Sequence, residues 1–267
     1  MEDGRAIAIW YYSDDEGVTG KETETWWTLP MASIAGMQEP CVVELADGSL
    51  FSWARTDQGA QWACRSHDGG RTWSPPAATT LHRNPDQMPL TMNELALLFP
   101  ADPEIPHLLK ELVMMCGKYG PEPLRGGKTE WNASLDPEAT AIVFRNAPAM
   151  LRSYGLDVTR QVAMTHEDVT RRFAADIRLR VVLDFAQVWF ARQDEIFFND
   201  PLAAVSVFEP EVCNLARGNV SVDLKDGTEK GRTLWQPDAG GRHEVAVTVD
   251  PTRFFMAFFD AFSLPAA

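Results

Sequence analysis

The sequence lacks any long apolar run and is short of positive charge. No stretch of about 18 consecutive apolar residues occurs, so no transmembrane helix is expected. The 267-residue chain has 24 lysines and arginines against 38 aspartates and glutamates, a formal net charge of −14. Because proteins hold nucleic acid mainly through basic side chains, this balance argues against nucleic-acid binding. A binding partner that is a cation or a neutral, polar small molecule is more compatible with this negative charge.

Cysteine is also scarce, and its spacing excludes two classes of protein. The four cysteines, at positions 41, 64, 116 and 213, form no C-x-x-C pair, which argues against the usual zinc sites and a disulfide-rich scaffold. The first residues lack the basic end and apolar core of a signal peptide. These absences predict reduced, mostly buried thiols in a cytoplasmic protein.

Residues 1–90 have the pattern of a β-rich segment. They carry six of the nine tryptophans and show short alternating runs without a helical period. Asp47-Gly48 separates two such runs, and the segment 67–70, His-Asp-Gly-Gly, separates another two. Both turn sequences favour β-hairpins, so residues 38–75 are expected to form antiparallel strands.

Residues 91–267 instead alternate between strand and helix patterns, which predicts an α/β domain with a mostly parallel sheet and flanking helices. Asp136 before Pro137 and Thr165 before Asp168 are helix-start signals. The long apolar segment 176–193 predicts a core helix. The remaining expected elements are strands at 112–115, 151–156, 219–224, 232–236 and 244–249, and a final helix at 251–262.

A turn motif in the first segment resembles a known repeat. Ser66-x-Asp68-x-Gly70-x-x-Trp73 is similar to the Asp-box of sialidase-type β-propeller blades. The stretch 38–57 also resembles such a blade. That resemblance implies that Glu39 assists a nucleophile and that Arg55 contacts a substrate carboxylate. Ninety residues supply one or two blades of a propeller, and no tyrosine nucleophile is visible, so independent sialidase activity is not expected.

The remaining two-thirds of the chain resemble the inosine-uridine nucleoside hydrolase family. The similar stretches are 111–117 (ELVMMCG), 130–139 (EWNASLDPEA), 155–159 (GLDVT), 199–204 (NDPLAA) and the tail from 231. The resemblance implies that water cleaves the N-glycosidic bond of a ribonucleoside through an oxocarbenium-like transition state. It also implies a Ca²⁺ ion that binds the ribose hydroxyls and the attacking water.

Five positions receive roles from this resemblance. Glu130 and Asn132 would grip the ribose hydroxyls, and their spacing puts them on the same side of an extended segment. Asp200 corresponds to a Ca²⁺ ligand, and it also suits the N-cap of a helix. Asn199 stands where many members have a histidine that protonates the leaving base, a role that an amide cannot fill. Leu124 replaces a further ribose-binding asparagine.

The chain departs from the family in its N-terminal part, where the aspartate cluster that supplies most Ca²⁺ ligands in the family has no counterpart. The segment 13–16, Ser-Asp-Asp-Glu, has the wrong spacing. One matching carboxylate predicts weak Ca²⁺ binding and low turnover.

Two alternatives to a nucleoside hydrolase stay open: a sialidase-related protein, or an inactive fusion that acts as a binding module. The expected partner is a small-molecule nucleoside, with a homo-oligomer possible. His243 is the histidine with the best prospect of a chemical role.

Overall fold

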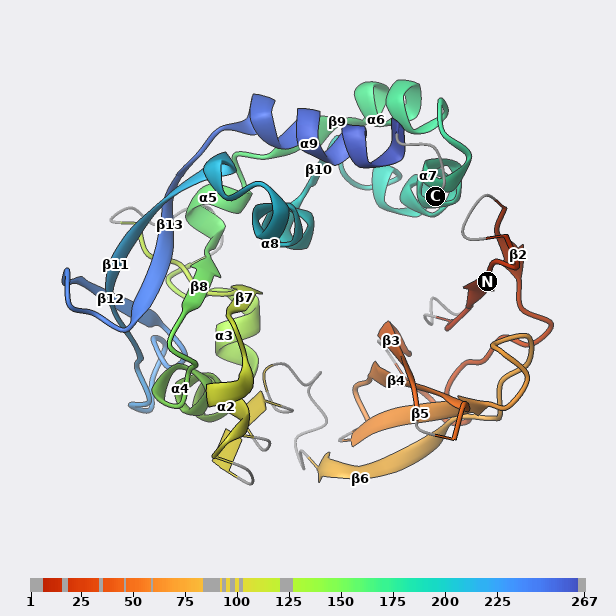
Figure 1. Ribbon diagram of the computed structural model, residues 1–267, viewed down its shortest axis with the longest axis horizontal. Coiled ribbons are helices and arrows are strands. Elements are labelled where there is room, and N and C mark those ends of the chain that lie inside the picture. Colours follow the sequence, from red (N-terminus) through yellow and green to blue (C-terminus); the bar gives the residue numbers. More distant parts are fainter. Residues whose placement is uncertain are drawn as a thin grey trace. The chain divides into compact units, whose positions relative to one another are not determined.

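The computed structural model describes residues 7–15, 19–33, 36–45, 47–58, 60–83, 92, 95–96, 99–100, 103–120 and 127–263. The chain divides into two compact units, of which the first comprises residues 1–97 with the last two residues, and the second residues 98–265. Figure 1 shows the elements of both. In the part of the chain that is described, no helix has the length and apolar character needed to cross a membrane.

The first unit consists of antiparallel strands, as the hairpin signals predicted. Its main sheet has the order β3-β4-β5-β6, in which each strand pairs with the next along the chain. Gly48, with a φ of 80°, allows the tight turn between β3 and β4. The strands are β1 Tyr11–Tyr12, β2 Lys21–Glu22, β3 Gln38–Glu44, β4 Leu50–Arg55, β5 Ala60–Ser66 and β6 Ala77–Arg83.

The turn after β5 is held by the carboxylate of Asp68. Its Oδ1 accepts hydrogen bonds from the backbone N–H groups of Arg71 (3.0 Å) and Thr72 (2.9 Å). The backbone N–H of Gly70, whose φ is 86°, donates to Ser66 Oγ over 2.9 Å. The side chains of this turn therefore satisfy backbone groups that the strands leave unpaired.

Trp73 follows the turn and packs back onto the first unit. It is buried, and its ring stacks on Trp10 with the ring centroids 4.6 Å apart. Its indole N–H donates to the carbonyl oxygen of Gly70 over 3.1 Å. The small core of this unit is built from Ala8, Trp10, Leu29, Met37, Ala54, Cys64 and Trp73.

The second unit contains a mixed five-stranded sheet in the order β12-β11-β13-β8-β7. β7, β8 and β13 run parallel, while β11 pairs antiparallel with both β12 and β13. The α/β class is confirmed, with an antiparallel hairpin added to the parallel strands. The strands are β7 Leu112–Met115, β8 Leu151–Tyr154, β9 Ala163–Thr165, β10 Glu195–Phe197, β11 Cys213–Val222, β12 Thr233–Pro237 and β13 His243–Val249.

Local signals explain where several helices begin. Asp136 caps α4, because its carboxylate accepts from Ala139 N over 2.8 Å, and Thr165 caps α6 in the same way through Asp168 N. Both starts are as predicted. The helices are α2 Ile105–Leu108, α3 Trp131–Leu135, α4 Pro137–Arg145, α5 Leu156–Thr159, α6 His166–Phe173, α7 Ile177–Phe190, α8 Asn199–Phe208 and α9 Pro251–Ser263, with a 3₁₀ turn at Pro210–Val212.

Helix α7 corrects one expectation. The segment 176–193 was predicted to be a core helix, but only Leu179 and Ala186 are buried in it. Phe185 is 58% exposed and Val188 is 77% exposed. The apolar residues surround the helix, so a high apolar content did not identify the one side that packs on the core.

The core of the second unit gathers around Phe198, which lies just before α8. Its ring makes edge contacts with Phe254, Phe255 and Phe258 of α9, with centroid separations of 5.3–5.7 Å. Phe254 is completely buried. The phenylalanines of α9 therefore serve core packing, which anchors the start of α8.

Candidate functional site

Hydrogen bonds connect the segments at the carboxyl ends of β7 and β8. Ser153 Oγ, on β8, donates to the carbonyl oxygen of Cys116 over 2.7 Å. The phenol oxygen of Tyr119 lies 2.8 Å from Ser153 Oγ. The N–H of Leu156 donates to the carbonyl of Gly117 over 2.9 Å. Ligand sites in α/β sheets gather at such strand ends, so this junction is the natural place for a site.

Gly117 is required at the turn after β7. Its φ is 89°, and a Cβ at this position would lie 2.4 Å from the Tyr119 hydroxyl oxygen. A side chain would therefore meet both backbone strain and a steric clash. This glycine allows the loop to fold back so that Tyr119 reaches Ser153.

Glu130 is buried, with 2% of its surface exposed, and its carboxylate is occupied by backbone groups. Oε1 accepts from Asn132 N over 2.7 Å, and Oε2 accepts from the N–H groups of Ala133 and Gly117, each over 3.0 Å. Glu130 thus caps α3 and ties it to the loop after β7. The expectation of an extended Glu130–Asn132 segment is wrong, because Asn132 already lies in the first turn of α3.

Burial dominates the electrostatics of Glu130. Loss of hydration raises the pKa of its carboxyl group, against the three backbone hydrogen bonds, which lower it. The negative charge of Asp200 raises this pKa further. Asp200 and Glu130, 70 positions apart in sequence, are therefore close enough to interact electrostatically.

Asn132 faces the edge of the sheet. Its Nδ2 donates to the carbonyl oxygen of Met115, the last residue of β7, over 3.1 Å. The side chain is half-buried. Asn132 therefore lies beside Glu130 at the end of β7, and its amide nitrogen contacts the strand itself.

Asn199 and Asp200 are placed by α8, which packs against β7. The helix begins at Asn199, so Asp200 lies in its first turn and is not the N-cap that the sequence suggested. A negative charge there still interacts favourably with the helix dipole. Asn199 Oδ1 is buried and has no hydrogen-bond partner among the described residues. A buried acceptor without a donor is unfavourable, and a ligand donor would relieve it.

The calcium ion that the resemblance implies does not fit the donors that the structure describes. Ca²⁺ takes six to eight oxygen ligands with several carboxylates. Asp200 supplies one exposed carboxylate, while both oxygens of Glu130 accept backbone N–H groups. Among the residues with described positions, no group of three histidines, cysteines, aspartates or glutamates is placed to hold a metal.

The two residues that the sialidase resemblance singles out lie on neighbouring strands of the first unit. Gln38 of β3 and Arg55 of β4 are cross-strand partners, and Arg55 Nη2 donates to Gln38 Oε1 over 3.0 Å. Glu39 belongs to β3, but its side chain lies outside the described residues, as does the whole of Leu124. The structure thus gives Arg55 an amide contact within the sheet.

His243 has a structural position. It is buried; its Nδ1 accepts from Val220 N over 2.9 Å, and its Nε2 lies 3.0 Å from the carbonyl oxygen of Phe144. This pattern fits a neutral ring with the proton on Nε2. Burial lowers the pKa of His243, and both ring nitrogens are engaged in contacts within the fold.

Sequence reasoning missed the residues that fix the loop after β7. Thr233 Oγ1 accepts from Lys118 N over 2.9 Å and donates to Lys118 O over 3.0 Å. Asp157 accepts a short hydrogen bond from the N–H of Tyr119. The one available signal was the position of Gly117-Lys118-Tyr119 directly after an apolar strand.

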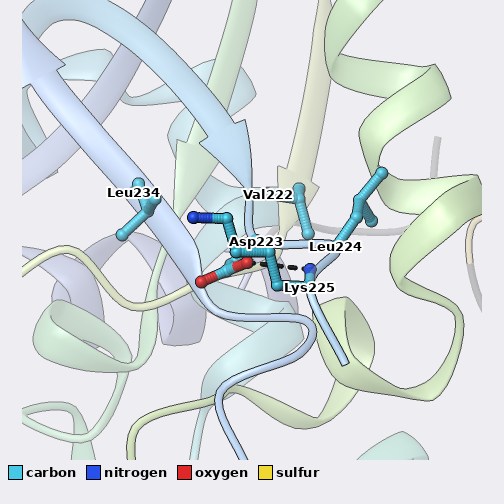
Figure 2. A pocket seen from close by; sticks show the side chains of 5 residues that line it. All are labelled: Val222, Asp223, Leu224, Lys225 and Leu234. Atoms are coloured by element: carbon cyan, nitrogen blue, oxygen red, sulfur yellow. Dashed lines mark hydrogen bonds between the residues drawn. The ribbon is translucent and has the colours of Figure 1, made fainter. Parts of the chain in front are cut away.

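Two surface hollows are described on the second unit, and the larger one is not lined by the residues at the ends of β7 and β8. It has a volume of about 500 Å³ and is lined by Val222, Asp223, Leu224, Lys225 and Leu234, none of which is a predicted site residue (Figure 2). Asp223 Oδ1 accepts from the backbone N–H of Lys225 over 2.9 Å. Asp223 and Lys225 are the charged residues of its lining.

Family comparisons divide the chain as the sequence patterns do. Residues 89–256 match the model of the inosine-uridine preferring nucleoside hydrolases. Residues 1–101 match the model of the BNR repeat-like domain.

Curated relatives and solved structures agree with the first match. The chain is 30% identical over 153 residues to probable uridine nucleosidase 1 of Oryza sativa subsp. japonica, which covers 55% of this chain and 46% of that protein. It is 31% identical over 182 residues to the non-specific ribonucleoside hydrolase RihC of Salmonella newport, covering 63% and 56%. The purine-preferring ribonucleoside hydrolase of Gardnerella vaginalis superimposes with a TM-score of 0.55 at 27% identity, covering 65% and 58%. The chain thus spans about half the length of its curated relatives.

Proposed function

Because the chain belongs to the inosine-uridine preferring nucleoside hydrolase family, we propose that it binds a ribonucleoside at the carboxyl ends of β7 and β8. We propose further that it hydrolyses the N-glycosidic bond slowly. The observation that carries the proposal is the unpartnered, buried Oδ1 of Asn199 beside Asp200. A hydroxyl group of a bound sugar would donate to this oxygen and satisfy it.

The described side chains support binding better than catalysis. Attack of water at the sugar carbon requires that the leaving base be protonated or otherwise stabilised. Asn199 can hydrogen-bond a base or a ribose but cannot donate a proton as an acid. The carboxylate of Glu130 holds three backbone N–H groups, which commits it to orienting the loop after β7 and the start of α3.

Asp200 is the remaining charged group at this place. Its exposed carboxylate can accept from a ribose hydroxyl or from the attacking water. Any Ca²⁺ that binds there is held weakly in this proposal, since the described residues place no group of three acidic, histidine or cysteine side chains to hold a metal. No step of the reaction is assigned to the ion.

The setting that we propose is cytoplasmic, with a small-molecule nucleoside as partner and neither nucleic acid nor membrane. Cys64, Cys116 and Cys213 are buried free thiols, and burial raises the pKa of Cys64 and of Cys213 to about 12. Such thiols are unreactive and suit a reducing compartment. The homo-oligomer expected from the sequence stays a prediction.

For the first unit, which matches the BNR repeat-like model, we propose a structural role. The turn Ser66–Trp73 has the bonding expected of an Asp-box, in which the carboxylate stabilises the hairpin and takes no part in chemistry. A sialidase role for Glu39 and Arg55 is the second candidate. Release of a fluorophore from a sialoside by the purified chain would favour it, and we expect none.

The test of nucleoside binding is calorimetric titration of the full chain with uridine and with inosine. Asn199→Ala should weaken binding by roughly tenfold, the effect of losing one hydrogen bond of about 1.4 kcal/mol. Asp226→Asn, a change at an exposed carboxylate, serves as the control and should bind as the unmodified chain does. 2′,3′-Dideoxyuridine, which lacks the 2′ and 3′ hydroxyls but keeps the 5′ hydroxyl, should bind worse than uridine. The proposal would be contradicted if Asn199→Ala bound uridine as tightly as the unmodified chain does and if the unmodified chain bound dideoxyuridine as tightly as uridine.

A further inference from the structure

The outer side of helix α7 carries a stripe of exposed apolar side chains. Its members, with their exposed fractions, are Ile177 (68%), Val181 (36%), Phe185 (58%) and Val188 (77%). Spacings of three and four residues place them along one face of an α-helix. The buried residues of α7, Leu179 and Ala186, lie on the opposite face. A row of large apolar side chains that faces water is unfavourable, so this stripe is a candidate interaction surface.

The neighbouring helix α6 leaves the stripe open. Helix α6 packs beside α7, and the ring of His166 in α6 stacks on Phe190 with the ring centroids 4.3 Å apart (Figure 1). Phe190 lies one turn after the buried Ala186, on the same face of α7. The contact with α6 is therefore made on the side of α7 away from the stripe, whose side chains stay exposed.

An arginine and an aspartate border one edge of the stripe. Arg180 and Asp184 are exposed, stand one helical turn apart and lie on the same edge. The carbonyl oxygen of Ala174, a neutral acceptor, accepts from Arg180 Nε over 2.9 Å. On the other edge, the guanidinium of Arg178 is paired with the carboxylate of Asp176 over 2.7 Å. The first edge therefore presents one positive group followed by one negative group.

This pattern is complementary to itself when two copies of α7 run antiparallel. The apolar pair Ile177 and Val188 and the charged pair Arg180 and Asp184 share a midpoint near residues 182–183. A two-fold rotation about that midpoint places Ile177 of one copy opposite Val188 of the other. The same rotation places each Arg180 opposite Asp184 of the other copy, because the charged edges of the two helices meet. The contact thus joins apolar groups to apolar groups and opposite charges to each other.

We propose that α7 is the contact between two copies of this chain, packed antiparallel across a two-fold axis. The 14 residues of α7 give it a length of about 21 Å. One helix from each copy makes a contact near the lower size limit for specific association, so the dimer should be weak, in the micromolar range. The net charge of −14 on each copy also opposes association. The inference concerns assembly and is independent of the proposed nucleoside site.

The test is sedimentation equilibrium of the full chain from low micromolar concentrations upward, at about 0.15 M salt, which limits charge repulsion to a range of about 8 Å. The average mass should rise from that of one chain towards that of two. Arg180→Glu and Asp184→Arg should each weaken the dimer by roughly tenfold or more, because both charge contacts then join like charges. An equal mixture of the two variants should associate again, because each contact in the mixed dimer joins opposite charges. Antiparallel pairing of α7 with α7 predicts this rescue.

Asp226→Arg is the matched control, since it reverses an exposed carboxylate on the loop between β11 and β12 and should associate as the unmodified chain does. Phe185→Ser removes an apolar contact without reversing a charge, and it should also weaken the dimer. Circular dichroism checks that each variant is folded, and if a charge variant is not, Phe185→Ser decides alone. A chain that stays monomeric at every concentration would overturn the proposal. Association that persists unchanged in Phe185→Ser or in both single charge variants, or a folded mixture that does not associate, would overturn it as well.

Discussion

The carboxylate of Glu130 accepts a hydrogen bond from the backbone N–H of Gly117 over 3.0 Å. This bond joins the start of α3 to the loop that follows β7. The resemblance to nucleoside hydrolases implies that Glu130 contacts a ribose, but both of its oxygens already hold backbone groups of this chain. Glu130 therefore orients the loop and helix that border the proposed site, and its contact with a ribose stays a prediction.

Replacement of Glu130 should destabilise the second unit. In Glu130→Ala three N–H groups lose their acceptor in a buried place, so the free energy of unfolding should fall by roughly 2–4 kcal/mol. Denaturant unfolding measures this change. Glu138→Ala is the control; Glu138 is exposed and pairs with Lys230, so the loss should be about 1 kcal/mol or less. Equal losses in the two variants would count against the capping role.

His243 should make stability depend on pH. Burial lowers its pKa in the folded state, so its contribution is complete above the pKa of the unfolded chain and is lost as pH falls through the folded value. The free energy of unfolding should therefore fall between about pH 7 and pH 5 relative to that of His243→Gln. The difference between the two proteins removes the contribution of Glu130, whose raised pKa has the opposite sign. Parallel pH curves would contradict this assignment.

The Asp68 turn should stabilise the first unit. Hydrogen bonds from the hydroxyl and backbone N–H of Thr72 hold the pKa of Asp68 well below its usual range. Asp68→Ala removes the acceptor for two backbone N–H groups, so the first unit should melt at a lower temperature, as followed by tryptophan fluorescence. Glu22→Ala, at an exposed position on β2, should melt as the unmodified chain does. An unchanged melting temperature in Asp68→Ala would show that the turn forms without its carboxylate.

Two substitutions on α7 test which side of that helix packs. Leu179 is buried, so Leu179→Ala should lower the free energy of unfolding by about 2–4 kcal/mol. Phe185 is 58% exposed, and Phe185→Ser should change it by about 0.5 kcal/mol or less. Denaturant titration of both variants provides the measurement. A larger loss in Phe185→Ser would show that this side of α7 is covered.

The elements predicted from the sequence are those that neighbouring residues determine. Asp136 and Thr165 cap helices through N–H groups three residues further along, and Gly48 permits its hairpin turn by its own φ. Such interactions depend on a few consecutive residues, so their patterns can be recognised in a sequence.

Long-range contacts decided what the sequence did not reveal. Glu130 caps α3 and also bonds Gly117, 13 residues earlier, while Thr233 holds Lys118 from a position 115 residues away. The exposed side of α7 follows from what packs against it and not from its composition. The resemblance pointed to the stretches of chain that border the proposed site, but the hydrogen bonds of Glu130 and Asn132 depend on contacts that form only in the fold.

The central claim is that this chain has a nucleoside site with weak catalysis, and release of free base tests it most directly. The purified 267-residue chain is incubated with uridine and inosine, with and without a chelator, beside a complete family hydrolase. We expect release at least about 10²-fold below that of the complete enzyme, because the position of the general acid carries Asn199. The remaining release should fall in Asn199→Ala and change little with chelator. Rapid, chelator-sensitive release of base by the unmodified chain would contradict the account.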